Sequence, residues 1–341
     1  MSNKARNTSL DAIKGFTIIL VMLGHVLVLN KVNDPILYDW IKAVQMPLFM
    51  IVSGYLCGRA GKVADRAAKE QISAIKSYTG MLKKRAIGYL LPFFAWTLVF
   101  HLDDFTWAIP GYLEQPERGL WFLITLFVLT FMVYTAQFAE ALAGKKNYIV
   151  GKLAFWAVYG ALALLVLLEN RAGIPWLGPH LTIMYIPYYM AAYLFGEYES
   201  LICKYVKKNA CYALAAAGGV FCIALAVTQD LMVMRNFVDY IAQISASFGG
   251  CASVIAVFYA MKENKVKKFL SWLGMYTLEI YSIHYHFAKI LNNGTLDLKV
   301  YSLPWLGFIL ASFAVMTALT ILVIWIAKRF KLTNYVLYGK K

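Results

Sequence analysis

The chain has 341 residues, of which 61% are hydrophobic and 15% are charged, and its formal net charge is +15. A soluble domain of this length needs far more polar surface, so the composition excludes an ordinary soluble protein and indicates a polytopic membrane protein. Apolar runs of about 20 residues recur along the sequence, each long enough to cross a bilayer as a helix. They lack the alternation of apolar and polar residues that barrel strands show, so we predict an all-α membrane helical bundle.

We expect about ten transmembrane helices in a single integral-membrane domain, residues 1–341. The apolar runs lie at roughly 11–30, 39–58, 86–104, 119–138, 152–168, 181–199, 210–229, 240–261, 269–290 and 305–327. With a cytoplasmic N-terminus, the inner segments hold 26 of the 33 Lys and Arg residues. This is the positive-inside pattern, and it predicts that both termini are cytoplasmic. Topology therefore accounts for the basic charge, and no motif supports a nucleic-acid partner.

The first run, LDAIKGFTIILVMLGHVLVLN, contains Asp11, Lys14 and His25. In a helix, Lys14 and His25 are close to three turns apart, so they share a face and lie roughly 16 Å apart along the axis. Asp11 pairs with Lys14 at i,i+3, although Lys14 could simply reach the headgroups and Asp11 could serve the helix start. His25 lies deep in the run, where an ionisable group is costly, and neutral imidazole can act as a general base. The alternative is a structural histidine that bonds to a neighbouring helix.

The second run contains MPLFMIVSGYL, residues 46–56, in which Pro47, Ser53 and Gly54 predict local irregularity and close approach of another backbone. The connection that follows, residues 58–85, interleaves apolar and basic residues, as in an amphipathic helix on the anionic inner leaflet. It ends in Lys83, Lys84 and Arg85. This cluster is either a topological anchor or a clamp for phosphate groups.

The outer segment 103–118 is acidic and aromatic, and we expect a loop long enough to cover a site. Trp121 opens the fourth run and is typical of the interfacial aromatic belt, or of a platform for a sugar ring. The five cysteines show no CxxC pair and no metal-binding spacing, so we expect neither a metal nor a disulfide framework.

The ninth run contains LSWLGMYTLEIYSIHYHF, residues 270–287, and carries Glu279, His284 and His286. Counted from the inner end, His284 lies at a depth similar to that of His25, so the two could face one cavity. Glu279 and His286 are about two turns apart and share a face, whereas His284 points elsewhere. Which of the two histidines faces inward stays open at this stage.

Taken in order, these stretches resemble the acyltransferase-3 family of integral-membrane acyltransferases, in the branch that O-acetylates bacterial surface polysaccharides and lipid-linked sugars. The elements that carry the resemblance are LDAIKGFTIILVMLGH, MPLFMIVSGYL, KKRAIGYLLPFF, GLWFLITLF, MYIPYYMAAYLFGE and LGMYTLEIYSIH. The resemblance covers most of the chain. It implies a multi-pass protein of the bacterial inner membrane that uses acetyl-CoA, a carbohydrate acceptor and no metal.

The resemblance also implies roles for individual residues. The family's first-helix signature, a basic residue and then a histidine after ten residues, is met by Lys14 and His25, with His25 catalytic and Lys14, paired with Asp11, beside the acyl-CoA path. The expected contacts to acyl-CoA are Arg85, Lys84, Lys83 and Ser53. The expected contacts to the acceptor are Trp121, His284, Glu279 and Tyr281. Many members carry a second arginine three or four residues after the first, where this chain has Gly88 and Tyr89.

Two mechanisms and one other protein class stay open. His25 could act as a general base in direct transfer, or it could carry the acyl group across the membrane as an acyl-imidazole. Ten spans with intramembrane His, Asp and Glu residues also fit a polysaccharide exporter or a proton-coupled transporter. The sequence shows no repeated half with matching broken helices, which favours the enzyme.

Overall fold

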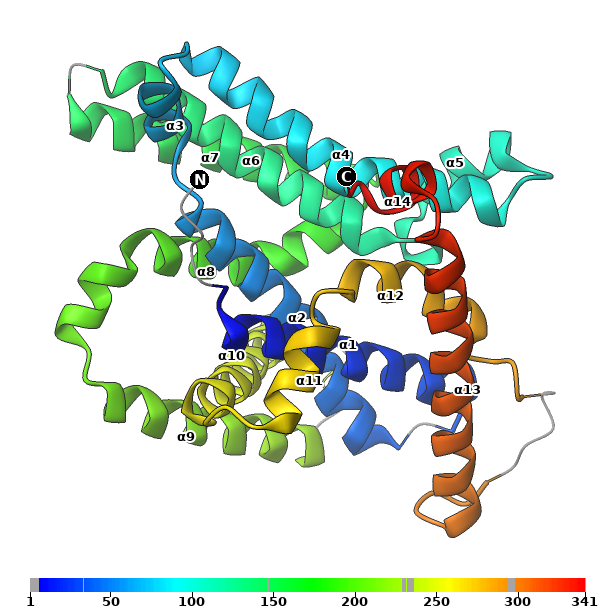
Figure 1. Ribbon diagram of the computed structural model, residues 1–341. Helices are drawn as coiled ribbons and strands as arrows, with labels where there is room; N and C mark the ends of the chain where they lie inside the picture. The colour runs from blue at the N-terminus through cyan, green and yellow to red at the C-terminus, as the bar shows by residue number, and fades with distance from the viewer. Residues whose placement is uncertain are drawn as a thin grey trace. The chain divides into compact units, whose positions relative to one another are not determined.

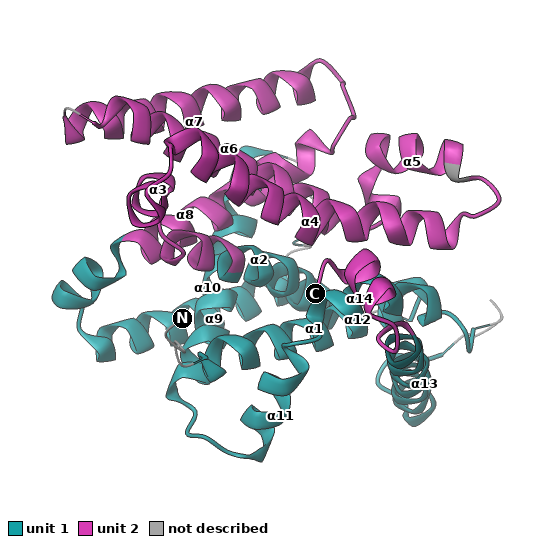
Figure 2. Cartoon of the chain, turned by 45° about the horizontal axis from the view of Figure 1, so that its top comes forward, with its two compact units in different colours: residues 1–52, 198–326 teal, residues 53–197, 327–341 magenta. Residues whose placement is uncertain are grey.

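The computed structural model describes residues 6–32, 34–145, 147–228, 231, 236–292 and 298–340. Throughout these residues the regular elements are helices, which confirms the all-α prediction. The chain forms two compact units, drawn in different colours in Figure 2. Unit 1 consists of residues 1–52 and 198–326, and unit 2 consists of residues 53–197 and 327–341.

Unit 1 is built around the first helix and the second half of the chain (Figure 1). Its helices are α1 (Thr8–Leu29), α9 (Lys208–Thr228), α10 (Phe237–Ala260), α11 (Lys265–Leu273), α12 (Thr277–Ile283) and the short η2 (His284–Phe287). It also holds most of α2 (Pro35–Arg59) and of α13 (Leu303–Ala327).

Unit 2 contains the middle of the chain and the C-terminal segment. Its helices are α3 (Val63–Glu70), α4 (Ala74–Phe100), α5 (Phe105–Glu114), η1 (Pro116–Arg118), α6 (Trp121–Ala143), α7 (Tyr148–Arg171), α14 (Lys331–Tyr338) and most of α8 (Pro179–Tyr205). Helix α6 packs against both α4 and α7.

Seven helices are long and apolar enough to cross a membrane: α1, α2, α6, α7, α9, α10 and α13. Helix α4 has 27 residues, and α8 has 27 residues with a kink at Tyr198, so both reach the required length with a less apolar composition. With the segmented stretch from α11 to η2, these elements account for the ten predicted runs. The faces of α7 and α9 are mostly exposed and apolar, as expected for helices that contact lipid.

The ninth predicted span is not one helix, which corrects the sequence interpretation. Helix α11 ends at Leu273, and α12 begins only at Thr277. A Cβ atom on Gly274 would lie 1.9 Å from the carbonyl oxygen of Asp11, so α1 contacts this break directly. Gly15 makes the reciprocal contact, because a Cβ there would lie 2.0 Å from the Leu270 oxygen. The break therefore lets two backbones touch where only glycine fits.

The ends of α1 are fixed by side-chain caps. The Asn7 side chain accepts a hydrogen bond from the Leu10 backbone N–H at 3.1 Å, which is a typical N-cap. At the other end, Asn30 Nδ2 donates to the carbonyls of Val26 and Ala288, each at 2.8 Å. Asn30 thus ties the C-terminal end of α1 to the segment that follows η2.

Glycines also allow α2 and α8 to approach closely within unit 2, as MPLFMIVSGYL predicts for Gly54. A Cβ on Gly54 would lie 2.2 Å from the Tyr189 oxygen, and one on Gly58 would lie 2.2 Å from the Tyr193 oxygen. The close backbone approach expected at Gly54 is therefore confirmed. Pro47 is accommodated inside α2 without ending the helix.

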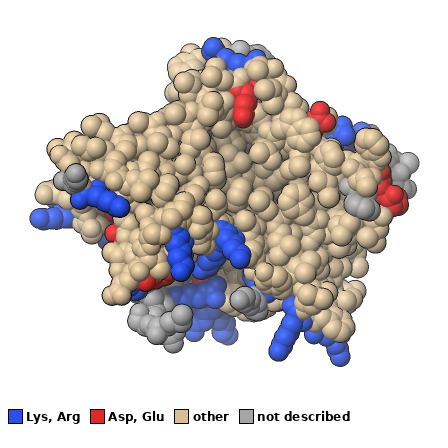
Figure 3. All heavy atoms as spheres, turned by 90° about the horizontal axis from the view of Figure 1, so that it is seen from above, with Lys and Arg blue, Asp and Glu red and all other residues tan. Residues whose placement is uncertain are grey.

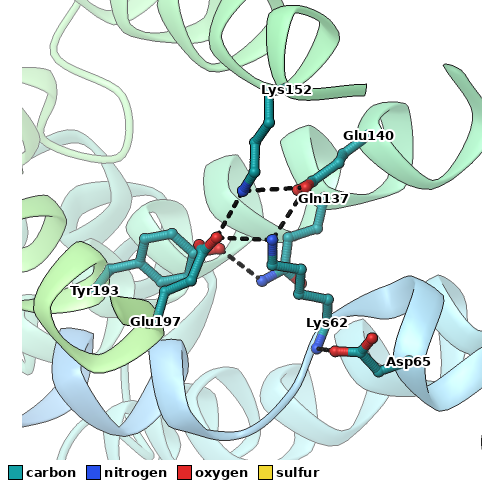
Figure 4. A network of polar contacts seen from close by, with 7 residues as sticks. All are labelled: Lys62, Asp65, Gln137, Glu140, Lys152, Tyr193 and Glu197. Atoms are coloured by element: carbon teal, nitrogen blue, oxygen red, sulfur yellow. Dashed lines mark hydrogen bonds and ion pairs between the residues drawn. The ribbon is translucent and has the colours of Figure 1, made fainter. Parts of the chain in front are cut away.

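Four charged side chains join the loop before α3 with three long helices of unit 2 (Figure 4). Lys62 Nζ lies 3.0 Å from Glu140 and 2.7 Å from Glu197. Lys152 Nζ lies 3.2 Å from Glu140 and 2.6 Å from Glu197. We call Lys62, Glu140, Lys152 and Glu197 the charged tetrad. It has no net charge, and each lysine is shared by both carboxylates.

Two connections differ from their sequence predictions. Residues 58–85 do not form one amphipathic helix, since they comprise the end of α2, the separate α3 and the first part of α4. The outer segment is not a plain loop, because it contains α5 and η1. In the face drawn in Figure 3, Lys and Arg side chains stand in small groups separated by wide uncharged surface, as a membrane protein requires.

Candidate functional site

The structure brings His25 and His284 into direct contact inside unit 1. Nδ1 of His25 and Nε2 of His284 are 2.8 Å apart, and the two rings stack with a 5.0 Å centroid distance. His25 is half-buried on α1, and His284 opens η2 and is fully buried. The rings of Tyr285 and His25 are nearly perpendicular, and their centroids lie 5.2 Å apart. We expected the two histidines to lie at a similar depth, and the hydrogen bond between them agrees with this expectation.

The surroundings of His284 answer which ninth-run histidine faces inward. His284 Nδ1 lies 2.8 Å from the Ile280 carbonyl oxygen, whereas His286 is exposed. Glu279 is fully buried in the first turn of α12. Tyr281 is buried with its ring 6.4 Å from that of His284. Three of the predicted acceptor-binding residues therefore lie in α12 and η2, and His284 contacts His25.

The N-terminal end of α1 carries a compact ionic group. Lys14 Nζ lies 2.6 Å from Asp11 Oδ1, and Arg6 binds the other oxygen of the same carboxylate. Asp11 is buried, whereas Lys14 is partly exposed. Because α1 is unbroken, Lys14 and His25 share a face three turns apart, as predicted. Asp11 therefore holds Lys14 near the N-terminal end of the helix face that also carries His25.

Arg85 lies on α4 in unit 2 among aromatic hydroxyls. Its Nε donates to the Tyr134 hydroxyl at 3.0 Å, and its Nη1 donates to the Tyr89 hydroxyl at 3.2 Å. The guanidinium also lies over the Tyr89 ring at 5.9 Å. No carboxylate pairs with Arg85 among the described residues. Tyr89, four residues after Arg85 on the same helix, thus helps to orient the guanidinium.

The other predicted acyl-CoA contacts are in different environments. Lys83 and Lys84 precede Arg85 on α4, and both are exposed. Ser53 is half-buried in α2 and stands at the start of unit 2. The cluster KKR thus separates into two surface cations and one guanidinium that is held in place.

The predicted acceptor residue Trp121 begins α6 and lies in unit 2. Its ring stacks on Tyr185 of α8 with a centroid distance of 5.4 Å and an interplanar angle of 20°. Trp121 is half-buried, so part of this aromatic pair remains accessible. Trp107 of α5, by comparison, is highly exposed. Tyr185 itself is buried, so the accessible part of the pair belongs to Trp121.

Sequence reasoning missed two kinds of residue. Lys42 of α2 is an exposed cation within an apolar run of the same unit as His25, and its ammonium lies 5.7 Å from the centroid of the Tyr38 ring. Its charge inside the second run was the signal that could have identified it. Tyr134 was missed for a different reason, since tyrosine is common in such helices and only the fold places it against Arg85.

Comparison with known proteins gives one family. A family described as an acyltransferase domain matches residues 7–326, and the match runs through both compact units. The nodulation protein NolL of Sinorhizobium fredii (strain NBRC 101917 / NGR234) is 29% identical over 143 residues. That alignment covers 37% of this chain and 36% of NolL, so the chain spans little more than a third of that relative. No solved structure matches the chain.

The family match confirms the expectation drawn from the six ordered stretches. Its residues include α1 with Lys14 and His25, α4 with Arg85, and the stretch from α11 to η2 with His284. The chain therefore belongs to the acyltransferase-3 family of acyltransferases, and its apolar helices make it a multi-pass membrane member.

Proposed function

We propose that this protein is an O-acetyltransferase of the bacterial inner membrane. It moves an acetyl group from cytoplasmic acetyl-CoA to a hydroxyl of a surface polysaccharide or a lipid-linked sugar. The observation that carries the proposal is the hydrogen-bonded pair of His25 and His284, enclosed in a chain that belongs to an acyltransferase family. An intramembrane imidazole with a fixed partner suits proton transfer more than packing.

The donor end of the proposal rests on Lys14 and Arg85. Lys14 is held by Asp11 at the inner end of the helix face that carries His25. The roughly 16 Å rise from Lys14 to His25 fits an extended pantetheine arm that enters from the cytoplasm. Arg85 has a positioned guanidinium and no described carboxylate partner, and a planar guanidinium binds phosphate oxygens in a bidentate manner.

The acceptor end of the proposal rests on aromatic and buried polar residues. Trp121 and Tyr185 form the stacked surface for a sugar ring in unit 2. Glu279 and Tyr281 are buried near His284 in unit 1 and supply polar groups to the acceptor hydroxyl. These assignments follow the chemistry of carbohydrate recognition, which combines aromatic faces with directed hydrogen bonds.

The proposed reaction is general-base catalysis at His25. The acceptor hydroxyl attacks the thioester carbonyl carbon while His25 Nε2 takes its proton. The C–O bond forms, the tetrahedral intermediate collapses with cleavage of the C–S bond, and His25 returns the proton to the departing thiolate. The products are the O-acetyl ester and free CoA.

The test compares membranes that contain wild-type protein, His25→Ala or His286→Ala at matched abundance. Labelled acetyl-CoA is added, and both label on extractable carbohydrate and release of free CoA are measured. We expect His25→Ala to lose transfer by roughly 10²–10⁴-fold, the usual contribution of a general base. His286 is exposed, so its variant is the matched control and should keep near wild-type transfer. Undiminished transfer by His25→Ala would contradict the proposal and favour a transporter.

A second experiment separates direct transfer from an acyl-histidine carrier. The purified protein is incubated with labelled acetyl-CoA and no acceptor, and the peptide that contains His25 is examined by mass spectrometry. Direct transfer predicts no acetylated His25. An acetyl group on His25 that later passes to added acceptor would replace the general-base mechanism with the acyl-imidazole mechanism.

A further inference from the structure

We infer that His284 is the positioning residue that fixes the tautomer of His25, with its own tautomer set by the Ile280 carbonyl. This inference rests on the proposed function, in which His25 is the general base. Its geometric basis is a chain of two hydrogen bonds. The His284 Nδ1 to Ile280 oxygen distance is 2.8 Å, and the His25 Nδ1 to His284 Nε2 distance is also 2.8 Å.

The direction of each hydrogen bond follows from the carbonyl. A carbonyl oxygen only accepts, so the proton between Ile280 and His284 resides on His284 Nδ1. His284 is fully buried, and among the described residues its two ring nitrogens bond to neutral groups, the Ile280 carbonyl and His25, so a charged imidazolium there would be strongly disfavoured. A neutral His284 that is protonated at Nδ1 presents a lone pair at Nε2.

The lone pair of His284 then determines the state of His25. Because His284 Nε2 accepts, His25 Nδ1 must donate, and a neutral His25 is left with its lone pair at Nε2. That nitrogen is the one able to take a proton from the acceptor hydroxyl. When it does so, His25 Nδ1–H keeps donating to His284, so the positive ring retains its partner. His284 thus orients the base as a buried carboxylate does in other triads, without adding a charge.

Two features of the fold keep this arrangement rigid. Asn30 ties the outer end of α1 to the Ala288 carbonyl just beyond η2, which fixes the distance between the two histidine-bearing segments. The Tyr285 ring lies nearly perpendicular to the His25 ring, at 87°, and limits rotation of the imidazole. Both ring nitrogens of His284 are already hydrogen-bonded, one to Ile280 and one to His25, so His284 acts through His25 and does not touch the substrate.

The test reads the tautomer directly. The chain has five histidines, so ¹⁵N-histidine labelling of the full-length protein in detergent gives few signals, and His25→Ala assigns one of them. Two-bond ¹⁵N–¹H couplings distinguish protonation at Nδ1 from protonation at Nε2. We expect His25 to be protonated at Nδ1 in the wild type and to shift towards the Nε2-protonated form in His284→Phe. His286→Phe, two residues further along and exposed, is the control and should leave the His25 signal unchanged.

Kinetics provide the second readout. His284→Phe should lower kcat by roughly 10²–10⁴-fold with little change in the KM for acetyl-CoA. The reason is that His25 would then carry its proton on Nε2 and could not accept one there. His284→Gln should recover activity to within about tenfold of wild type, since its amide oxygen accepts from His25 Nδ1. Wild-type His25 protonated at Nε2, or a tautomer unchanged in His284→Phe, would overturn the inference. The wild-type spectrum tests the His25 tautomer by itself, even if a variant does not fold. A wild type that transfers no acetyl group would refute the proposed function alone, because the tautomer is measured without substrate.

Discussion

In the basic cluster Lys83, Lys84 and Arg85, only Arg85 is held in place by neighbouring side chains. It is hydrogen-bonded to Tyr134 and Tyr89, whereas Lys83 and Lys84 beside it are exposed. A solvent-exposed cation contributes little to binding, because water and salt screen it. A guanidinium held by two hydroxyls has already lost its conformational freedom, so it binds an anion at lower entropic cost.

This difference predicts unequal effects of neutral substitutions. Arg85→Gln should raise the KM for acetyl-CoA by about tenfold or more with a smaller change in kcat, since a charge-assisted hydrogen bond contributes roughly 1.5–3 kcal/mol. Lys84→Gln is the matched control on the adjacent residue and should change the KM less than about twofold. Initial rates over a range of acetyl-CoA concentrations measure both. Equal effects in the two variants would mean that the cluster acts only as diffuse positive charge.

Individual site residues were predictable where charge conflicts with an apolar run. Asp11, Lys14 and His25 stand out for this reason, and the helical repeat alone places Lys14 and His25 on one face. The contact between His25 and His284 was not predictable in the same way. It depends on a helix break and a short 3₁₀ turn that rotate His284 towards α1, and neither has a periodic signature.

At the scale of the elements, the break between α11 and α12 depends on backbone contact with α1. A methyl group on Gly274 would lie 1.9 Å from the Asp11 oxygen, so either helix must move to admit it. A shift there would displace α12 and η2, and with them His284. The sequence indicated a continuous span because apolar residues continue through the break, whereas glycine alone does not identify a contact.

We therefore expect Gly274→Ala to destabilise the protein by about 1–3 kcal/mol, the usual cost of overpacking, and to reduce transfer. Gly307→Ala in α13 is the control, since nothing lies within 4 Å of a Cβ added there. The stability of both variants can be followed by denaturant titration in detergent. If Gly274→Ala is as stable and as active as Gly307→Ala, the close contact between α1 and the break is wrong.

The charged tetrad provides an element-scale test in unit 2. Its side chains are only 10–22% exposed, so each charge depends on its partners (Figure 4). Glu197→Gln removes a carboxylate from both lysines and should cost about 3 kcal/mol of stability. Glu70→Gln disrupts only the exposed pair with Arg66 and should cost less than about 1 kcal/mol. Equal unfolding midpoints for the two variants would show that the tetrad does not stabilise unit 2.

For the whole molecule, composition and charge asymmetry predicted the all-α multi-pass class, and helix lengths bear this out. Lipid excludes unpaired backbone groups, so long apolar runs have few alternatives to helices. Sequence periodicity did not reveal how the chain divides into two compact units, in which α2, α8 and α13 each cross a boundary. Such a division depends on contacts between distant residues.

The predicted topology can be tested with native cysteines. Cys203 and Cys211 are exposed and flank an inner basic stretch, whereas Cys57, Cys222 and Cys251 are buried. A membrane-impermeant maleimide should therefore label inverted vesicles and leave intact spheroplasts unlabelled. The labelling should disappear in the Cys203→Ser/Cys211→Ser double variant. Labelling of that pair from the outer face would reverse the orientation derived from the positive-inside pattern.

The central claim is acyl transfer at His25 by a membrane-embedded enzyme. It is tested most directly in proteoliposomes of purified protein, with labelled acetyl-CoA on one side and a carbohydrate acceptor present. For the wild type, the account predicts one CoA released for each acetyl group that appears on the acceptor, and for His25→Ala it predicts a rate at the protein-free background. Stoichiometric transfer by His25→Ala at the wild-type rate would contradict it.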